Sequence, residues 1–193
     1  MEIAGSDHEF VKTEKMNYSE RLLCKQALID MLVAAEVRHH IVAELPPGAT
    51  EVGILATLRH WAARVDRHYL GRNWAQRCRM TERLAGAVFL ERGKVAGLPH
   101  AHMVVRPPVT ANDLHFVWNV PFWFAPHPVR ELRSFYPRPV TERGKMHITP
   151  IGETVDDRRK VASYAAKGLE RSDLAYKNWC LVADLDRFSH VSR

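Results

Sequence analysis

The sequence contains few cysteines, no long apolar run and no leader pattern at its start. Its three cysteines, Cys24, Cys78 and Cys180, are odd in number and far apart, so they fit neither a disulfide framework nor a zinc-binding spacing. No apolar run approaches the roughly 20 residues of a membrane span, and the first ten residues lack a basic start followed by an apolar block. We therefore expect a cytoplasmic protein with no membrane partner.

Internal repeats and low-complexity stretches are also missing, and so is the G-x-x-x-x-G-K-S/T pattern that holds nucleotide phosphates. The chain has 193 residues, of which 46% are hydrophobic and 26% charged, as in a globular domain with a real core. Lys and Arg number 28 against 22 Asp and Glu, which gives a net charge of +6. This excess mildly favours a polyanionic partner such as nucleic acid.

Hydrophobic periodicity and turn signals predict an α+β fold in which helices pack on one side of a central antiparallel β-sheet. The predicted helices cover residues 19–37, 50–71 and 154–170. The predicted strands cover residues 39–45, 84–91, 100–106 and 145–151, and a final strand or short helix covers 178–185. A short turn makes strands 84–91 and 100–106 hairpin neighbours. We expect residues 1–38 to form an N-terminal helical extension and residues 39–193 the main domain.

Residues 109–140 carry many aromatic side chains among several prolines. Two interpretations stay open for this segment. The aromatics could form a satellite core under a long connection, or a platform on which unpaired bases stack.

The most informative segment is LPHAHMVV, residues 98–105, because it places His100 and His102 two positions apart. On a strand such residues point to the same face, about 6–7 Å apart. Two neutral imidazoles can chelate one divalent cation, whereas in a core each ring would leave a polar nitrogen to satisfy. The same spacing also fits two surface histidines on an exposed strand, so the pair alone does not establish a metal site.

Glu91 ends the strand before the histidines, and a hairpin neighbour can present its carboxylate beside their rings. Two imidazoles and one carboxylate form a three-ligand set with open positions, suited to Mg²⁺, Mn²⁺ or another first-row ion. An ordinary charge at a strand end would occupy the same position.

Tyr164 and Lys167 are three residues apart in a predicted helix and so share one face. A phenol, with a pKa of about 10, attacks poorly unless a cation or base helps to remove its proton. Lys167 could lower that pKa or neutralise a phosphate. Taken alone, Tyr164 also fits a half-buried packing residue.

Together these motifs, PHAHMVV at 99–105 and YAAK at 164–167, resemble the HUH endonuclease superfamily. The match covers about residues 39–170 and is most similar to single-tyrosine rolling-circle replication initiators, or Rep proteins. The resemblance implies a sheet of RRM-like topology in an HUH nuclease-like domain at 39–193. It also implies single-stranded DNA at a replication origin as the substrate.

In such a nuclease the metal polarises the scissile phosphate, the tyrosine attacks phosphorus and the 3′-hydroxyl leaves. The protein stays joined to the 5′-phosphate, so a later hydroxyl can reverse the step. The resemblance gives Glu91, His100 and His102 as ligands of Mn²⁺ or Mg²⁺, Tyr164 as nucleophile and Lys167 as its basic partner. Residues 39–43 lie where the family has a first motif but do not clearly match it. Many Rep proteins carry a helicase domain, and this chain would need a separate helicase.

Other interpretations of the same motifs remain. Conjugative relaxases share the Pro-His-x-His run but usually place the tyrosine before the histidines, where Tyr18 is the candidate. Single-tyrosine transposases share the histidines but normally lack Tyr-x-x-Lys. Histidine-triad hydrolases need a histidine where Leu98 stands. The 2H phosphoesterases need two H-x-S/T motifs, a pattern that His147-Ile148-Thr149 fits. A non-catalytic basic module that binds nucleic acid also stays open.

Overall fold

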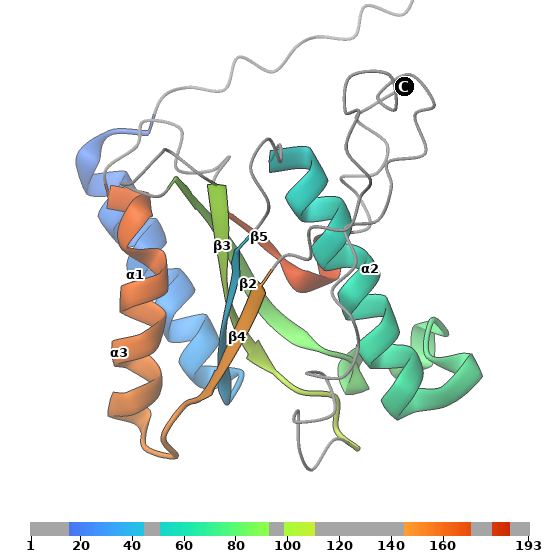
Figure 1. Ribbon diagram of the computed structural model, residues 1–193. Helices are drawn as coiled ribbons and strands as arrows, with labels where there is room; N and C mark the ends of the chain where they lie inside the picture. Colours follow the sequence, from blue (N-terminus) through green and yellow to red (C-terminus); the bar gives the residue numbers. More distant parts are fainter. Residues whose placement is uncertain (1–15, 45–50, 93–98, 111–144, 171–178, 186–193) are drawn as a thin grey trace, which may run out of the picture.

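A five-stranded antiparallel β-sheet with packed helices forms the centre of the molecule, which confirms the expected α+β class (Figure 1). The computed structural model describes residues 16–44, 51–92, 99–110, 145–170 and 179–185. The strands are β1 (His39–Glu44), β2 (Ala85–Arg92), β3 (Pro99–Arg106), β4 (Lys145–Pro150) and β5 (Trp179–Leu181), in the order β4-β1-β3-β2-β5. The α-helices are α1 (Tyr18–Ala34), α2 (Glu51–Leu70) and α3 (Val155–Ala165).

Short 3₁₀ helices complete the elements, at η1 (Gly71–Asn73), η2 (Arg77–Glu82), η5 (Ala166–Glu170) and η7 (Val182–Asp184). The last predicted element is therefore β5 followed by η7. The predicted helix over 154–170 is wrong in its last turn, because α3 ends at Ala165 and the chain continues as η5. Tightening to 3₁₀ geometry is common at the carboxyl end of a helix. The predicted helix cap at residue 50 and the aromatic residues from 111 onward lie outside the described residues.

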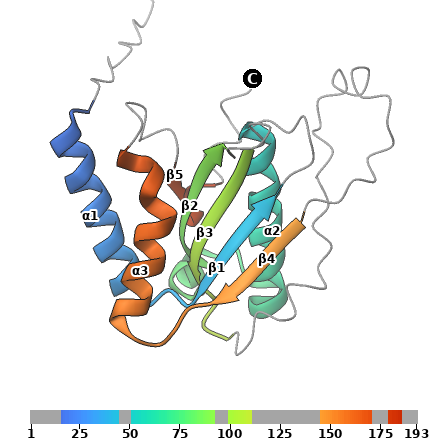
Figure 2. The same cartoon turned by 60° about the vertical axis from the view of Figure 1, so that its left-hand side comes forward.

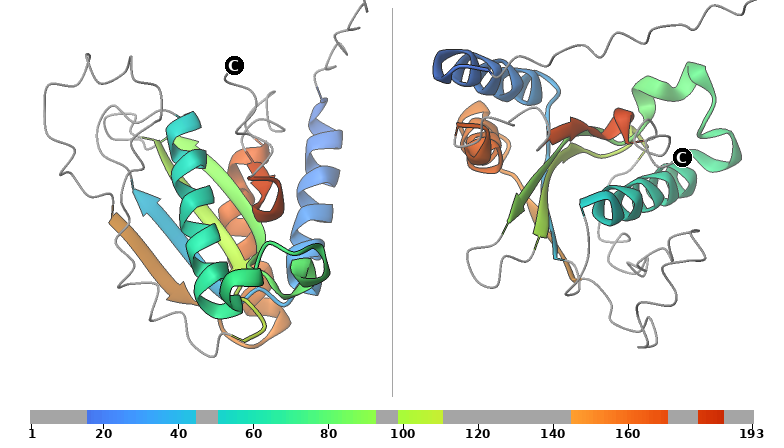
Figure 3. Two further views of the ribbon diagram at one scale, coloured as in Figure 1. Left: turned by 90° about the vertical axis from the view of Figure 1, so that its right-hand side faces the viewer. Right: turned by 90° about the horizontal axis from the view of Figure 1, so that it is seen from above.

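Helices cover both faces of the sheet, so the expectation that they pack on one side is wrong. Seen from above, α1 and α3 lie on one face and α2 on the other (Figure 3). The reason lies in β3, where every residue from Ala101 to Val105 is buried. A strand with such a continuous buried run needs an apolar cover on each side.

The core on the α2 side follows from the apolar stripe of that helix. Leu58 and Val65 of α2 are fully buried or nearly so and pack on Ile41, Met103 and Val88 of the three central strands. Asp66 of α2 is also buried, and its two carboxylate oxygens accept hydrogen bonds from Arg83 Nε at 2.8 Å and from the Leu84 backbone N–H at 2.7 Å. These bonds pair a buried charge and tie α2 to the start of β2.

The core on the other face joins α1 to α3. Helix α1 begins at a capping box in which Asn17 and Glu20 satisfy each other's backbone N–H groups. The buried residue Leu32 of α1 belongs to the same cluster as Ala162 and Ala165 of α3 and Phe89 of β2. The two helices lie side by side along this face (Figure 2), and Lys25 of α1 forms an ion pair with Glu170 of η5. Helix α1 therefore supports the helix that carries Tyr164.

The β2–β3 hairpin is the element that builds the site. Its antiparallel register places Glu91 opposite His100 and Phe89 opposite His102, as expected for hairpin neighbours. Gly86 has a φ of +140°, and a Cβ there would lie 2.1 Å from the carbonyl oxygen of Val104. Glycine at this position lets β2 approach β3 closely enough to keep that register. Within the described ranges, none of the helices has the length and apolar character needed to cross a membrane.

Candidate active site

The hairpin brings the three predicted metal ligands together. Glu91 on β2 and the pair His100 and His102 on β3 point to the face that α1 and α3 cover. One ligand atom from each residue lies within 4.8 Å of those of the other two. Period-two alternation on β3 and the cross-strand pairing to β2 are sufficient to produce this cluster.

One carboxylate oxygen is the centre of the cluster. Oε2 of Glu91 lies 3.2 Å from His102 Nε2, 3.5 Å from His100 Nε2 and 3.1 Å from Lys167 Nζ. Partial burial raises the pKa of Glu91, but the hydrogen bond and charge of Lys167, followed by the two imidazoles, outweigh it and leave that pKa below its usual value. The Glu91 carboxyl is therefore ionised at neutral pH, and its oxygens can coordinate a cation.

His102 supplies the clearest sign that this cluster suits a cation. Its side chain is 4% exposed, and burial, followed by the nearby His40 and His100, lowers the pKa of His102 to about 4, although Glu91 opposes this. Its Nε2 makes no hydrogen bond within the described part of the chain, even though Glu91 Oε2 is 3.2 Å away. A buried nitrogen without a hydrogen-bond partner beside an anionic oxygen fits a shared divalent cation.

His40 is a member of this site that the sequence analysis did not identify. It lies on β1, and its Nε2 is 3.1 Å from His102 Nδ1, with the two ring planes inclined by 5°. Burial, and after it the charge of Lys167, lowers the pKa of His40. The doublet His39-His40 on a predicted strand was the available signal, but its meaning depends on the long-range pairing of β1 with β3.

Tyr164 lies on α3 with its ring perpendicular to two imidazoles. The ring centroids are 5.6 Å apart for His102 and 5.9 Å apart for His40, at interplanar angles of 90° and 85°. Tyr164 is 52% exposed, unlike the neighbouring residues Ala165 and Ala166, which are buried. A tyrosine that lies beside this Glu–His cluster and is still half exposed can meet a substrate there.

Lys167 lies between Tyr164 and Glu91. Its Nζ is 4.2 Å from the centre of the Tyr164 ring and 3.1 Å from Glu91 Oε2. Burial lowers the pKa of Lys167, but hydrogen bonding and charge from Glu91, and after them from Tyr164, outweigh it and raise that pKa. Lys167 therefore stays a cation beside the phenol, although it extends from the 3₁₀ helix η5 rather than from α3.

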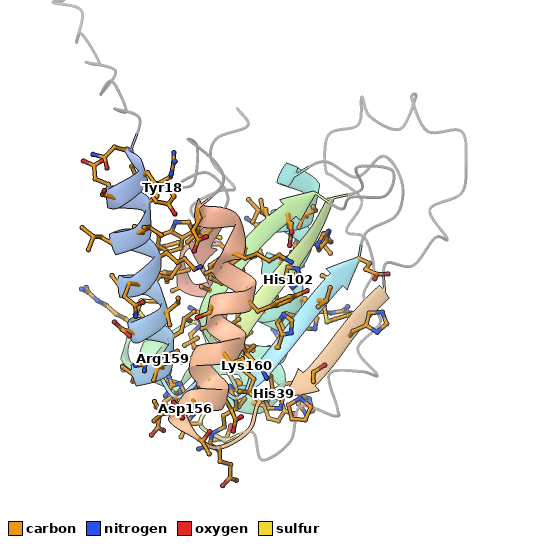
Figure 4. All side chains as sticks on the ribbon, turned by 90° about the vertical axis from the view of Figure 1, so that its left-hand side faces the viewer. Tyr18, His39, His102, Asp156, Arg159 and Lys160 are labelled. Carbon is orange, nitrogen blue, oxygen red and sulfur yellow. The ribbon has the colours of Figure 1, made fainter. Side chains whose placement is uncertain are left out.

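Tyr18, the alternative nucleophile, is not brought to this site. It is the first residue of α1, is 58% exposed, and its ring lies 5.8 Å from the guanidinium carbon of Arg21 on the same helix. Figure 4 shows Tyr18 at the outer end of α1 and His102 on the far side of α3. His147, from the H-x-T match, is an exposed residue of the edge strand β4, opposite Val42 of β1.

The arrangement joins two chemical capacities on one face of the sheet. Two imidazoles and a carboxylate can hold a Lewis acid, and a partly exposed phenol with an adjacent ammonium group can act as a nucleophile. Long-range packing brings these groups together, because the candidate ligands lie on the β2–β3 hairpin and the phenol lies on α3. Comparisons with protein-family models, with curated proteins and with solved structures found no match to this chain.

Proposed function

We propose that this protein is a metal-dependent endonuclease and strand transferase that nicks single-stranded DNA through a covalent phosphotyrosine intermediate at Tyr164. The observation that carries the proposal is the perpendicular packing of the Tyr164 ring, 5.6 Å between centroids, on His102 of the Glu91-His100-His102 cluster. An ordinary packing tyrosine has no need of a cation-ligand set and a lysine at its side.

The chemistry assigns one role to each side chain. Glu91, His100 and His102 hold the divalent ion, Mn²⁺ or Mg²⁺, which when bound supplies Lewis-acid polarisation of the scissile phosphate. The Tyr164 oxygen forms a bond to phosphorus and releases its proton to solvent. The bond from phosphorus to the 3′-oxygen breaks, and that oxygen takes up a proton. The product is a 5′-phosphotyrosine ester that a later 3′-hydroxyl can reverse.

Lys167 assists this transfer through its position. Before attack, its ammonium group lies beside the phenol, 4.2 Å from the centre of the Tyr164 ring. During attack, the same charge offsets the negative charge that builds on the phosphoryl oxygens. Its ion pair with Glu91 and its contact with the Tyr164 ring keep the ammonium group within reach of both.

We infer a nucleic-acid substrate from the net charge of the chain and from the family resemblance. A net charge of +6 favours a polyanion, and the order of motifs matches rolling-circle initiators most closely. We therefore infer a role in starting rolling-circle replication at an origin, with a separate helicase to open the duplex. A relaxase is disfavoured because Tyr18 lies away from His102 (Figure 4).

The test is adduct formation on single-stranded DNA. The protein is incubated with a randomised pool of single-stranded oligonucleotides and Mn²⁺, and the denatured protein is digested and searched by mass spectrometry for tyrosine peptides that carry a phosphonucleotide. We expect the Tyr164 peptide to be modified, and the modification to disappear with EDTA and in Tyr164→Phe. The Phe variant keeps the ring, so DNA binding should stay close to that of the wild type.

Tyr18→Phe is the matched control and should form the adduct normally. An adduct on Tyr18 instead would indicate a relaxase and overturn the assignment of Tyr164. DNA binding that is unchanged by EDTA, with no adduct on any tyrosine, would indicate a non-catalytic binding module.

A further inference from the structure

His40 and His102 form a pair of imidazoles that link β1 to β3 beneath Tyr164. The register pairs His40 with Val104 and Val42 with His102, so the two histidines lie on the same face, offset by two residues. His40 Nε2 is 3.1 Å from His102 Nδ1, the ring centroids are 5.3 Å apart and the planes are inclined by 5°. This distance and near-coplanarity are those of a hydrogen bond between the two rings.

The two nitrogens of His102 face different partners. Nδ1 faces His40, whereas Nε2 lies 3.2 Å from Glu91 Oε2. A neutral imidazole carries one N–H and one lone pair, and the hydrogen bond made by one nitrogen sets the role of the other. Only the tautomer with its proton on Nδ1 presents a lone pair to a cation held by Glu91. That tautomer needs an acceptor opposite Nδ1.

We propose that His40 is a positioning residue that accepts this proton and so fixes both the tautomer and the ring orientation of His102 for metal binding. His40 then carries its own proton on Nδ1 and remains neutral. The proposal rests on the metal site of the proposed function. Partners that accept the second N–H of a metal-ligating histidine raise its basicity and typically contribute a factor of about 10–100 to metal affinity.

The geometry separates this role from that of a fourth ligand. The nitrogen of His40 that is directed at the cluster is already 3.1 Å from His102 Nδ1, on the side of the ring remote from Glu91. The Tyr164 ring packs perpendicular to both imidazoles, at 85° to His40 and 90° to His102. Since the phenol contacts both rings, the orientation that His40 gives to His102 also sets the surface on which Tyr164 rests.

The test compares two replacements of His40 for their affinity for Mn²⁺ alone, measured by electron paramagnetic resonance of the free ion. His40→Leu removes the acceptor and fills the space with an apolar side chain. We expect the dissociation constant for Mn²⁺ to rise about 10–100-fold. His40→Gln can present its amide oxygen to His102 Nδ1–H, so most of the affinity should return. His147→Gln, on the edge strand, is the matched control and should bind Mn²⁺ as the wild type does.

A spectroscopic measurement on the wild type makes the test independent of any variant that fails to fold. In protein labelled with ¹⁵N-histidine and saturated with Mg²⁺, the ring nitrogens of His102 should report a proton on Nδ1. A proton on Nε2 would overturn the proposal, and so would wild-type Mn²⁺ affinity in a folded His40→Leu protein. Either result would leave adduct formation at Tyr164 intact, whereas normal Mn²⁺ binding without any adduct would overturn the proposed function alone.

Discussion

Lys167 lies between the Glu91 carboxylate and the proposed nucleophile, with its Nζ 3.1 Å from Glu91 Oε2 and 4.2 Å from the centre of the Tyr164 ring. Removing one such preorganised contact typically lowers a rate by about 10²–10³-fold. We expect Lys167→Ala to slow single-turnover DNA cleavage by that factor at saturating DNA. Lys167→Arg should restore only part of the rate, because a planar fork replaces a compact point charge.

Lys160→Ala is the control for Lys167, since it removes an exposed lysine of α3, seven residues earlier in the chain. At saturating DNA it should cleave at the wild-type rate. If Lys167→Ala also recovered the wild-type rate there, Lys167 would act only through DNA binding.

Cys180 and Cys78 differ in the exposure of their thiols. Burial, and after it the negative charge of Asp184, raises the pKa of Cys180 to about 12, whereas Cys78 is exposed. The thiolate is the reactive form, so at pH 8.5 the folded protein keeps Cys180 protonated. With iodoacetamide at this pH, peptide mass spectrometry should show Cys78 alkylated and Cys180 alkylated on the order of 100-fold more slowly.

In urea both thiols should react alike, because an unfolded cysteine has a pKa of about 8.5. Equal rates in the folded protein would contradict the burial of Cys180 on β5, where it pairs with Val88 of β2.

For individual residues, the sequence was informative where side chains that can bind a metal recur at the two-residue period of a strand. His100 and His102 are two apart on a strand, and Glu91 closes the same hairpin, so local rules brought all three together. His40 was missed because its role depends on the register of β1 against β3, which joins segments about 60 residues apart. No local pattern encodes that register.

Helix α1 is the element whose packing can be tested most cleanly. Leu32 is fully buried against the α3 side of the core, whereas Leu23 on the same helix is 71% exposed. Leu32→Ala should lower the free energy of unfolding by about 2–5 kcal/mol, because it deletes buried methyl groups and leaves a cavity. Leu23→Ala should change it by about 0.5 kcal/mol or less. Urea unfolding followed by circular dichroism measures both.

Both substitutions change helix propensity equally, so their difference reports packing alone. Equal losses for the two variants would show that α1 does not pack on α3 in solution. Because α3 carries Tyr164, we also expect Leu32→Ala to reduce adduct formation, and Leu23→Ala to leave it unchanged.

The helices and strands were largely predictable from the sequence, but the face of the sheet that each helix covers was not. Strands β2 and β3 were expected within one residue of their bounds, because turns and apolar runs delimit them. All helices were expected on one face, although the run from Ala101 to Val105, which is buried on both sides of the sheet, favours cover on each face. The end of α3 at Ala165 was missed because the residues after it have no breaker until Gly168.

At the scale of the whole molecule, the site joins three parts of the chain that only the tertiary fold brings together. The candidate ligands lie on the neighbouring strands β2 and β3, His40 lies on β1, and the phenol lies on α3, which packs against α1. The strand order β4-β1-β3-β2-β5 sets these distances, and it arises from long-range pairings that no local periodicity reveals. An ion bound at the hairpin therefore bridges central strands rather than a surface loop.

That placement predicts how the whole protein responds to metal. A ligand that binds only the folded state stabilises it by about 2.7 kcal/mol when present at about 100 times its dissociation constant. For a chain of this size we expect Mn²⁺ to raise the melting temperature by about 5–10 °C, and EDTA to reverse the increase. His100→Ala and His102→Ala should lose most of the increase, whereas His147→Ala on the edge strand should keep it. Differential scanning calorimetry of the four proteins measures this, and an undiminished increase in His102→Ala would mean that the ion binds elsewhere.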